Sequence, residues 1–393
     1  KAYSVFRDGD ELDPGWITRP FPWLRSFRLF SGLGANWGPT LDVKYDTEMG
    51  QNPVQNTRWE TEHAKRYEFF RDGGDWRRRP FEERFEWADF DRMNDRAAAS
   101  GLEVHFNLAG APEVFTGDRG EYQTYHFNEM PIVDGPAWQR YVDTLFAHLR
   151  AKPWFGRTHY SFFNEPNCLW TEADGTVRHF GYEGDAEQYA RQYLWTWQAM
   201  KPYLAPGQLH LGPFVAEPDR ADGTADNLPD FLGSIAREFQ AHAEPLPPWS
   251  AFAFNVYETP QIGLDDLASN KVAYARRLLA ERFPGRSIPL RFDEFGIHPI
   301  LFPAFQKDVG RPLYSTRWAM TWHAEMLALM LDEGIQQGGS WLHIYLLQDE
   351  HDSAPYLAEL FLTRVVHGTD LVLTDDGWLA AFETAARAIR AFA

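Results

Sequence analysis

The chain has 393 residues, a formal net charge of −18, and an aromatic share of 16% that includes 16 Trp. The negative charge argues against nucleic acid as a partner, because phosphate binding requires a footprint of Lys and Arg. No apolar run approaches the roughly 20 residues of a membrane-spanning helix, so we expect no membrane partner either. The aromatic excess predicts rings exposed in a binding cleft for a neutral or weakly charged ligand.

Apolar β-like runs alternate with helical patterns, which indicates βαβ units and a parallel sheet. We predict eight strands, at 27–33, 66–70, 101–108, 158–163, 208–215, 250–257, 288–293 and 339–346. Between and after them we predict helices at 90–100, 136–152, 185–203, 228–242, 271–282, 316–332 and from 378 to the end. The order predicts an α/β fold, a (β/α)8 TIM barrel with enlarged strand-to-helix loops.

We expect one domain over 1–393, in which 1–26 form an N-terminal extension packed on the barrel, because α/β barrels of this length occur as single units. The loops after four strands are long: 34–56, 110–135, 167–184 and 297–312. They carry aromatic residues that include Trp37 and Trp170, which are candidate walls of a site at the C-terminal face of the barrel.

Two acidic motifs follow β-prone runs. Glu165 stands in Asn164-Glu165-Pro166-Asn167 after strand 158–163, and Glu294 stands in Asp293-Glu294-Phe295-Gly296 at the end of strand 288–293. A barrel gathers the ends of its strands, so it can bring these two carboxyls together. A glycosidase needs at least two carboxyl groups that face each other across the bond to be cleaved.

Retaining hydrolysis needs one protonated acid and one ionised nucleophile about 5 to 5.5 Å apart. We expect nearby negative charge to keep Glu165 protonated, whereas donors such as Tyr257 and a cation such as Arg66 hold Glu294 ionised. Asn164, next to the acid, is placed to donate to a sugar 2-hydroxyl.

With these residues the chain resembles glycoside hydrolase clan A, the retaining (β/α)8 glycosidases, over roughly 27–390 in strand order. The resemblance implies that Glu165 is the acid/base and Glu294 the nucleophile. The Asn-Glu-Pro-Asn form and the turn at 108–112 are most similar to family 39, whereas Asp293-Glu294-Phe295-Gly296 is similar to the nucleophile strand of family 5. Asn255 stands where these families often have His, two residues before the strand-end Tyr.

The same resemblance implies a sugar-binding role for three further residues. Trp341, on the eighth predicted strand, is similar to the clan's platform beneath the cleaved sugar, with barrel core as the alternative. Asn107, near the end of the third strand, and Arg66, in the second, are equally consistent with a substrate role and a structural one. Together with Trp37, Trp170, Asn164, Asn255 and Tyr257 they complete the expected carbohydrate site.

Other chemistries lack their motifs. The chain has no Gly-x-Ser-x-Gly elbow, no His-Glu-x-x-His zinc motif and no phosphate loop, so we expect no cofactor and no metal. Cys168 is the single cysteine, and we interpret it as a small filler because no His follows it closely. The acidic run 348–352 is interpreted as a solvated loop, with a cation site as the alternative.

The sequence therefore predicts a retaining O-glycoside hydrolase that cleaves oligo- or polysaccharides. Two alternatives stay open: a transglycosylase of the same fold, and a non-catalytic glycan-binding barrel, against which the presence of both glutamates argues. Lys1 in place of an initiator Met favours a secreted or periplasmic protein over a cytoplasmic one. The sugar, its anomer, the choice between exo and endo action and the oligomeric state do not follow from these patterns.

Overall fold

The computed structural model describes only part of the chain: residues 26–29, 87, 91, 94–95, 98–99, 101, 103–108, 131–171, 177–179, 182, 184–216, 226–258, 264–297, 333–335, 339–340, 363–366 and 370–373. The chain divides into two compact units. The first unit comprises 6–214 and 227–250, and the second comprises 215–226 and 251–393 with 1–5. The single domain expected over 1–393 stays a prediction.

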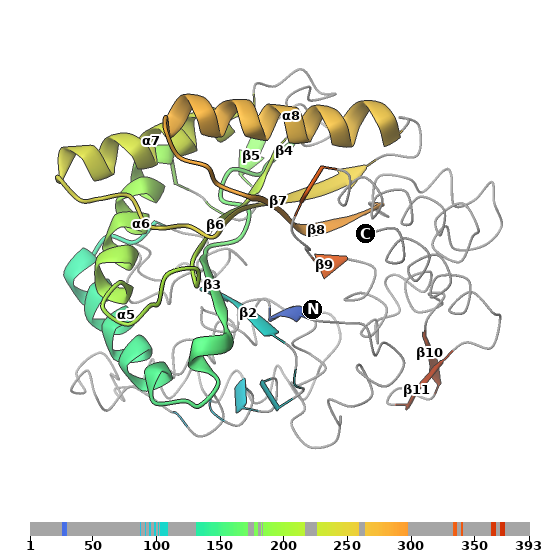
Figure 1. Cartoon of the computed structure of the whole chain (residues 1–393), viewed down its shortest axis with the longest axis horizontal. Coiled ribbons are helices and arrows are strands. Elements are labelled where there is room, and N and C mark those ends of the chain that lie inside the picture. The colour runs from blue at the N-terminus through green and yellow to red at the C-terminus, as the bar shows by residue number, and fades with distance from the viewer. Residues whose placement is uncertain are drawn as a thin grey trace, which may run out of the picture. The chain divides into compact units, whose positions relative to one another are not determined.

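The first unit is built on parallel strands covered by helices (Figure 1). Strands β1 (Ser26–Leu29), β2 (Glu103–Leu108) and β3 (His159–Phe162) pair in parallel in that order. A parallel bridge from Tyr160 to Leu209 then leads into β6 (His210–Val215). This alternation of strand and helix confirms the predicted α/β class.

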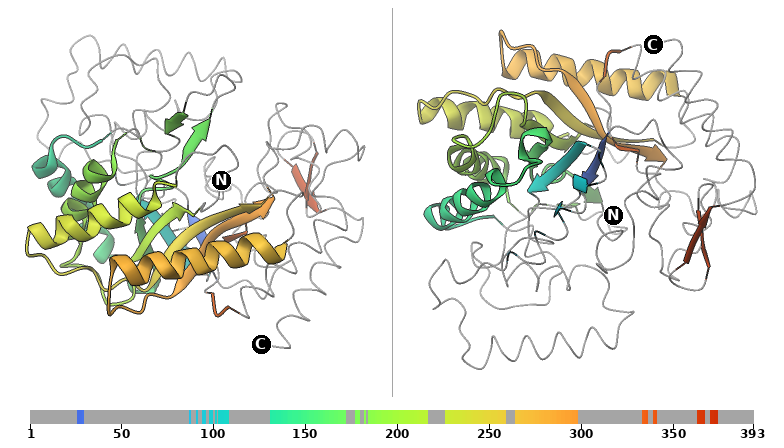
Figure 2. Two further views of the ribbon diagram at one scale, coloured as in Figure 1. Left: turned by 90° about the horizontal axis from the view of Figure 1, so that it is seen from above. Right: turned by 60° about the horizontal axis from the view of Figure 1, so that its bottom comes forward.

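Three helices pack in sequence order beside these strands, and Figure 2 shows them from two further sides. They are α5 (Gly135–Arg150), α6 (Ala186–Met200) and α7 (Leu228–Ala241). Helix α5 begins where Asp134 Oδ1 accepts a hydrogen bond of 3.0 Å from Ala137 N. Helix α6 begins with a capping box between Asp185 and Gln188.

The helices cover one face of the strands with aromatic side chains. Phe162 lies 5.8 to 6.3 Å, ring centre to ring centre, from Trp138 of α5 and from Tyr189 and Tyr193 of α6. Tyr160 meets Phe146 of α5 at 5.2 Å. Since these rings are at most 2% exposed, they form the hydrophobic core of the first unit.

The second unit also alternates strand and helix, with β7 (Ala251–Glu258), α8 (Leu264–Arg282), β8 (Leu290–Ile297) and β9 (Gly339–Ser340). β8 pairs in parallel with β7 and with β9. Phe254 of β7 and Phe292 of β8 meet edge to face at 5.0 Å. Strands β10 (Thr363–Val366) and β11 (Asp370–Leu373) form an antiparallel hairpin that was not predicted.

Most predicted elements of the described residues are confirmed, with three differences. Helix α8 begins at Leu264 rather than at 271, because Leu264, Leu267 and Ala268 continue the helical spacing of apolar residues towards the N-terminus. Strand β8 continues to Ile297, so Glu294 lies within the strand and not at its end. The expected loop 167–184 contains a hairpin of β4 (Leu169–Thr171) and β5 (Val177–His179). The predicted strand 66–70 and the helices 316–332 and 378–393 lie outside the described residues.

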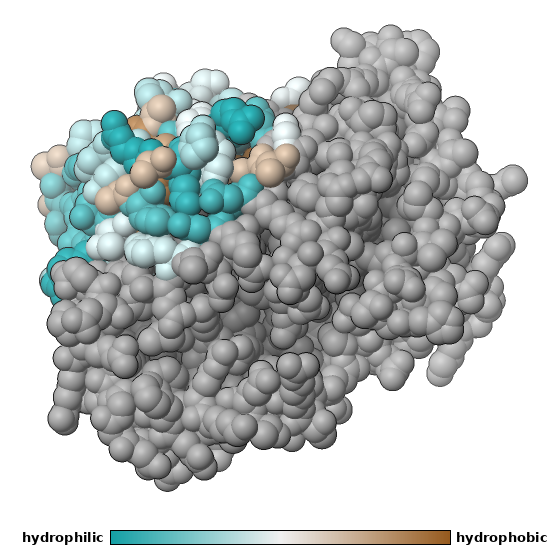
Figure 3. All heavy atoms as spheres, turned by 90° about the horizontal axis from the view of Figure 1, so that it is seen from below, coloured by the Kyte–Doolittle hydropathy of each residue, from teal (hydrophilic) through white to brown (hydrophobic). Residues whose placement is uncertain are grey.

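The described surface is largely hydrophilic on the face drawn in Figure 3. Among the described residues, Val133 is the large apolar side chain that stands out, at 64% exposed. None of the described helices is long and apolar enough to cross a membrane.

Candidate active site

Glu165 occupies a tight turn directly after β3. Phe163 and Glu165 both have left-handed backbone angles, with φ of 64° and 48°. Such angles are uncommon for residues other than glycine and persist only where the surroundings enforce them. Here the neighbouring strands supply that constraint: Phe163 N donates to Leu108 O at the end of β2 at 2.8 Å, and Glu165 N donates to Pro213 O in β6 at 2.9 Å.

The turn is closed on its far side as well. Cys168 N donates to Glu165 O at 3.0 Å, and Asn167 is 2% exposed. The Glu165 side chain is itself 9% exposed, whereas Asn164 is partly exposed. The carboxyl of Glu165 is thus carried by a backbone that is fixed to β2, to β6 and to its own following turn, which is the preorganisation that a catalytic acid requires.

The left-handed angle at Phe163 breaks the alternation of the strand. Phe162 and Phe163 both join the aromatic layer, since Phe163 lies 5.1 Å from Tyr182 and 6.3 Å from Tyr189. Burial raises the pKa of Tyr189 well above its ordinary value of 10, and Tyr193 and Tyr182 add to the shift. Phe162, the last residue of β3, and Phe163, the first residue after it, are therefore both held by contacts with buried tyrosine rings shortly before Glu165.

The opposite side of the same strands is polar. Along β2 and β3 its buried residues alternate with the aromatic ones: they are His105, Asn107 and Ser161, and the half-buried His159 and the buried His210 of β6 lie beside them. The ring of His210 lies 4.7 Å from that of His105 and stacks at 4.9 Å on that of His159. Two chemically different faces therefore meet at the end of the strand that carries Glu165.

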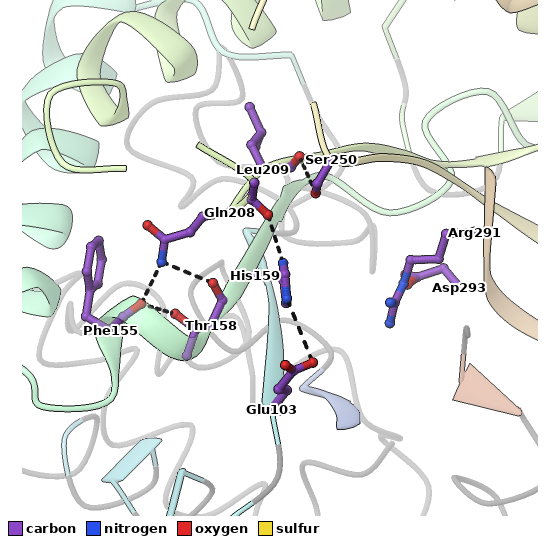
Figure 4. A network of polar contacts seen from close by, with 10 residues as sticks. Glu103, Phe155, Thr158, His159, Gln208, Leu209, Ser250, Arg291 and Asp293 are labelled. Atoms are coloured by element: carbon purple, nitrogen blue, oxygen red, sulfur yellow. Dashed lines mark hydrogen bonds and ion pairs between the residues drawn. The ribbon is translucent and has the colours of Figure 1, made fainter. Parts of the chain in front are cut away.

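His159 has the best-defined contacts of the three histidines (Figure 4). Its Nδ1 lies 3.1 Å from Gly207 O, a carbonyl that only accepts, so Nδ1 carries a proton. Its Nε2 lies 3.9 Å from Glu103 Oε2. Within the described residues, no group of three or more His, Cys, Asp or Glu side chains is placed to hold a metal ion.

Glu294 lies in the second unit, in the middle of β8. The register of β7 and β8 shifts between Phe254 and Asn255, so that Asn255 is opposite Glu294. On the other side, Glu294 pairs with Gly339 of β9. Such irregularities occur often next to active sites, where they change the aim of a strand residue.

The carboxyl that precedes Glu294 has a partner of its own. Asp293 is fully buried, and Arg291 Nε donates to its Oδ1 at 3.2 Å (Figure 4). A buried carboxylate needs such a partner, because an isolated charge is costly in the protein interior. Asp293 is thus held by a structural ion pair.

The structure distributes the predicted site residues over both units. Asn107 lies in β2 of the first unit, and Asn164 and Glu165 follow β3 of the same unit. Asn255, Tyr257 and Glu294 belong to β7 and β8 of the second unit. Trp170 lies in β4, paired with Arg178 of β5. Arg66, Trp37 and Trp341 lie outside the described residues.

Sequence reasoning missed the polar residues on β2 and β3 other than Asn107. The signal was present as a period of two: His105 and Asn107 flank Phe106, and His159 and Ser161 flank Tyr160. A period of two over so few residues does not by itself separate a polar face inside the fold from a solvated one.

No protein-family model matches the sequence, and no curated protein matches it. Solved structures that match this chain include a GH5_18 protein from Streptomyces cattleya in complex with GlcNAc, at 14% identity and a TM-score of 0.48, covering 99% of this chain and 77% of that one. A GH5-4 broad specificity endoglucanase from an uncultured bacterium matches at 10% identity and a TM-score of 0.47, covering 95% of this chain and 84% of that one.

A glucosidase from Croceicoccus marinus matches at 12% identity and a TM-score of 0.46, covering 78% of this chain and 53% of that one. This chain thus spans about half the length of that glucosidase. With such low identities and TM-scores below 0.5, these likenesses leave the assignment of function to the residues of the site.

Proposed function

We propose that this protein is a retaining O-glycoside hydrolase on a (β/α)8 barrel, with Glu165 as acid/base and Glu294 as nucleophile. The observation that carries the proposal is the turn of Glu165, whose left-handed backbone is tied to β2 and β6 at the carboxyl end of a parallel strand. Catalytic residues of parallel α/β folds come from such strand ends. Strain held in place by two neighbouring strands is also typical of functional positions.

The reaction proceeds in two steps. In the first, Glu165 donates its proton to the glycosidic oxygen while the Glu294 carboxylate attacks the anomeric carbon, so that the leaving sugar departs and a glycosyl ester forms. In the second, Glu165 takes a proton from water, the water oxygen attacks the anomeric carbon, and the ester bond to Glu294 breaks. Each carboxyl thereby returns to its starting state, and the product keeps its anomeric configuration.

The other proposed site residues bind the sugar or hold the nucleophile. Asn164 donates to the 2-hydroxyl, and Asn255, opposite Glu294 in the sheet, and Asn107 bind further hydroxyls. Tyr257 and Arg66 keep Glu294 ionised. The aromatic rings of Trp341, Trp37 and Trp170 stack on sugar faces.

The test is a panel of aryl pentosides, hexosides, deoxyglycosides and uronides, hydrolysed by the wild type, Glu165→Gln and Glu294→Gln. Loss of the nucleophile is expected to lower kcat by about 10⁴-fold or more. Loss of the acid is expected to lower it by about 10² to 10⁴-fold on poor leaving groups, and far less on a leaving group that needs no proton. Glu187→Gln, an exposed glutamate on α6, is the matched control and is expected to retain full activity.

Trapping with a 2-fluoro glycoside and peptide mapping then identifies the nucleophile. A glycosyl label on Glu294 and a retained anomer in the product support the mechanism. Full turnover by Glu294→Gln, or an inverted product, contradicts it. Sugar transfer to an added acceptor in preference to water identifies a transglycosylase with the same two residues.

A further inference from the structure

Asn107 and Ser161 occupy matching places on neighbouring strands. The register of β2 and β3 pairs them directly, so their side chains lie on the same face, away from the aromatic layer. Asn107 is 0% exposed and Ser161 is 1% exposed. They are the last polar pair before the strand end, since the next pair in the register is Leu108 with Phe162.

The polar side-chain atoms of Asn107 and Ser161 have no hydrogen-bond partner among the described residues. Within the part of the chain that the structure describes, neither the oxygen nor the nitrogen of the Asn107 amide accepts or donates a hydrogen bond, and the Ser161 hydroxyl makes none either. Buried polar groups are satisfied in the great majority of cases, so three such atoms at one register position require an explanation.

The amino end of β3 provides an internal comparison (Figure 4). There the buried Thr158 hydroxyl lies 2.7 Å from Phe155 O and 2.6 Å from Tyr160 Oη. The buried Gln208 amide donates to Phe155 O at 2.7 Å and to Thr158 O at 3.1 Å. At this end of the strand, the buried hydroxyl of Thr158 and the buried amide nitrogen of Gln208 thus both have partners in the protein.

The pair without partners adjoins the turn of Glu165. Phe163 N donates to the carbonyl oxygen of Leu108, the residue after Asn107, and Glu165 stands four residues after Ser161. A group bound by Asn107 and Ser161 is therefore held beside the proposed acid. An amide that donates and accepts, together with a hydroxyl, complements a group that does both.

We propose that Asn107 and Ser161 together bind one hydroxyl of the sugar substrate and select sugars that carry it. The inference rests on the proposed glycosidase function and adds Ser161 to its site as a specificity-determining residue. The bound hydroxyl supplies the partners that the protein itself does not. A site built around such a contact rejects analogues that lack the hydroxyl, because its buried polar groups are then left unpaired.

Stability is the first readout, and it does not depend on any substrate. The double variant Asn107→Leu, Ser161→Ala replaces unsatisfied polar groups by apolar ones, so its Tm in the absence of sugar is expected to equal or exceed that of the wild type. The matched control Thr158→Val removes satisfied hydrogen bonds directly before β3 and is expected to lower Tm. A fall in Tm of the double variant as large as that of Thr158→Val overturns the inference, because the pair is then structural.

Specificity is the second readout. The probes are the best-cleaved aryl glycoside of the panel and its monodeoxy analogues. We expect the double variant to lose about 10- to 100-fold in kcat/KM on the parent glycoside and to lose nothing on one particular deoxy analogue, whereas Thr158→Val leaves kcat/KM unchanged on all of them. An equal loss on every analogue overturns the inference, since no single hydroxyl is then recognised.

The two proposals fail in distinguishable ways. Hydrolysis that depends on Glu165 but shows no analogue-specific effect overturns the role of Asn107 and Ser161 and leaves the glycosidase in place. If no glycoside is cleaved in a Glu165-dependent manner, the glycosidase itself is wrong, and the sugar-binding role of the pair falls with it.

Discussion

The two faces of β2 and β3 differ sharply although both are buried. One face presents Tyr160 and Phe162 to aromatic residues of α5 and α6, and Phe106 stacks on Tyr160. The other presents His105, His159, Asn107 and Ser161, of which the last two have no partner among the described residues. A sheet that needed only stability would be apolar on both faces.

The difference teaches which residues hold the fold and which are available for chemistry. On the face that is covered by the helices, the aromatic rings pack against one another and hold the ends of the strands in place. The polar residues lie on the same strands, so the aromatic packing on the other face fixes their positions. They contribute little to that packing themselves. We expect substitutions on the two faces to separate stability from activity, and the predictions below are ordered by the size of the expected effect.

The largest effect is expected for Phe162→Ala. Its ring contacts Trp138, Tyr189 and Tyr193, so its removal leaves a cavity and is expected to lower the free energy of unfolding by about 3 to 5 kcal/mol. Urea denaturation followed by Trp fluorescence measures the change. Ser161→Ala, one residue earlier on the opposite face, is the control and is expected to change stability by less than about 0.5 kcal/mol. Equal losses in the two variants contradict the separation of the faces.

A smaller loss is expected for Gly135→Ala in the helical layer. A Cβ at this position comes within 2.6 Å of the Trp195 ring of α6, so the two helices have to shift, at a cost of about 1 to 3 kcal/mol. Urea midpoints measured in a double-mutant cycle with Trp195→Leu test the cause. The penalty is expected to disappear in the Trp195→Leu background, and a penalty that persists there shows that the contact with Trp195 is not its source.

The helical layer is the part that the sequence predicted best. The predicted helices 136–152 and 185–203 agree with α5 and α6 to within three residues at each end, and the apolar spacing of Trp138, Tyr141, Phe146 and Leu149 accounts for the first of them. These signals are local, since each depends on residues less than four turns apart. The same holds for Glu165, whose motif directly follows a clear strand.

The remaining features depend on contacts that local patterns do not contain. The left-handed angles at Phe163 and Glu165 are imposed by Leu108 and Pro213, which belong to other strands. The pairing of Asn107 with Ser161 depends on the register of two strands. The hairpin of β4 and β5 lacks a clear alternation, so three-residue strands were interpreted as loop.

The helical layer also predicts a pH limit. Burial raises the pKa values of Tyr189, Tyr182 and Tyr160 above their ordinary value of 10, so the folded protein keeps these protons while the unfolded chain releases them. Stability is therefore expected to be unaffected by these groups below about pH 10 and to fall above it, by up to about 1.4 kcal/mol per pH unit for each tyrosine. In Tyr189→Phe, the free energy of unfolding is expected to fall less steeply with pH, by up to about 1.4 kcal/mol per pH unit, because one titrating hydroxyl is removed. Denaturation at increasing pH, together with tyrosinate absorbance, measures it, and an unchanged slope shows that the Tyr189 hydroxyl already titrates in the folded state and that the aromatic layer is open to water.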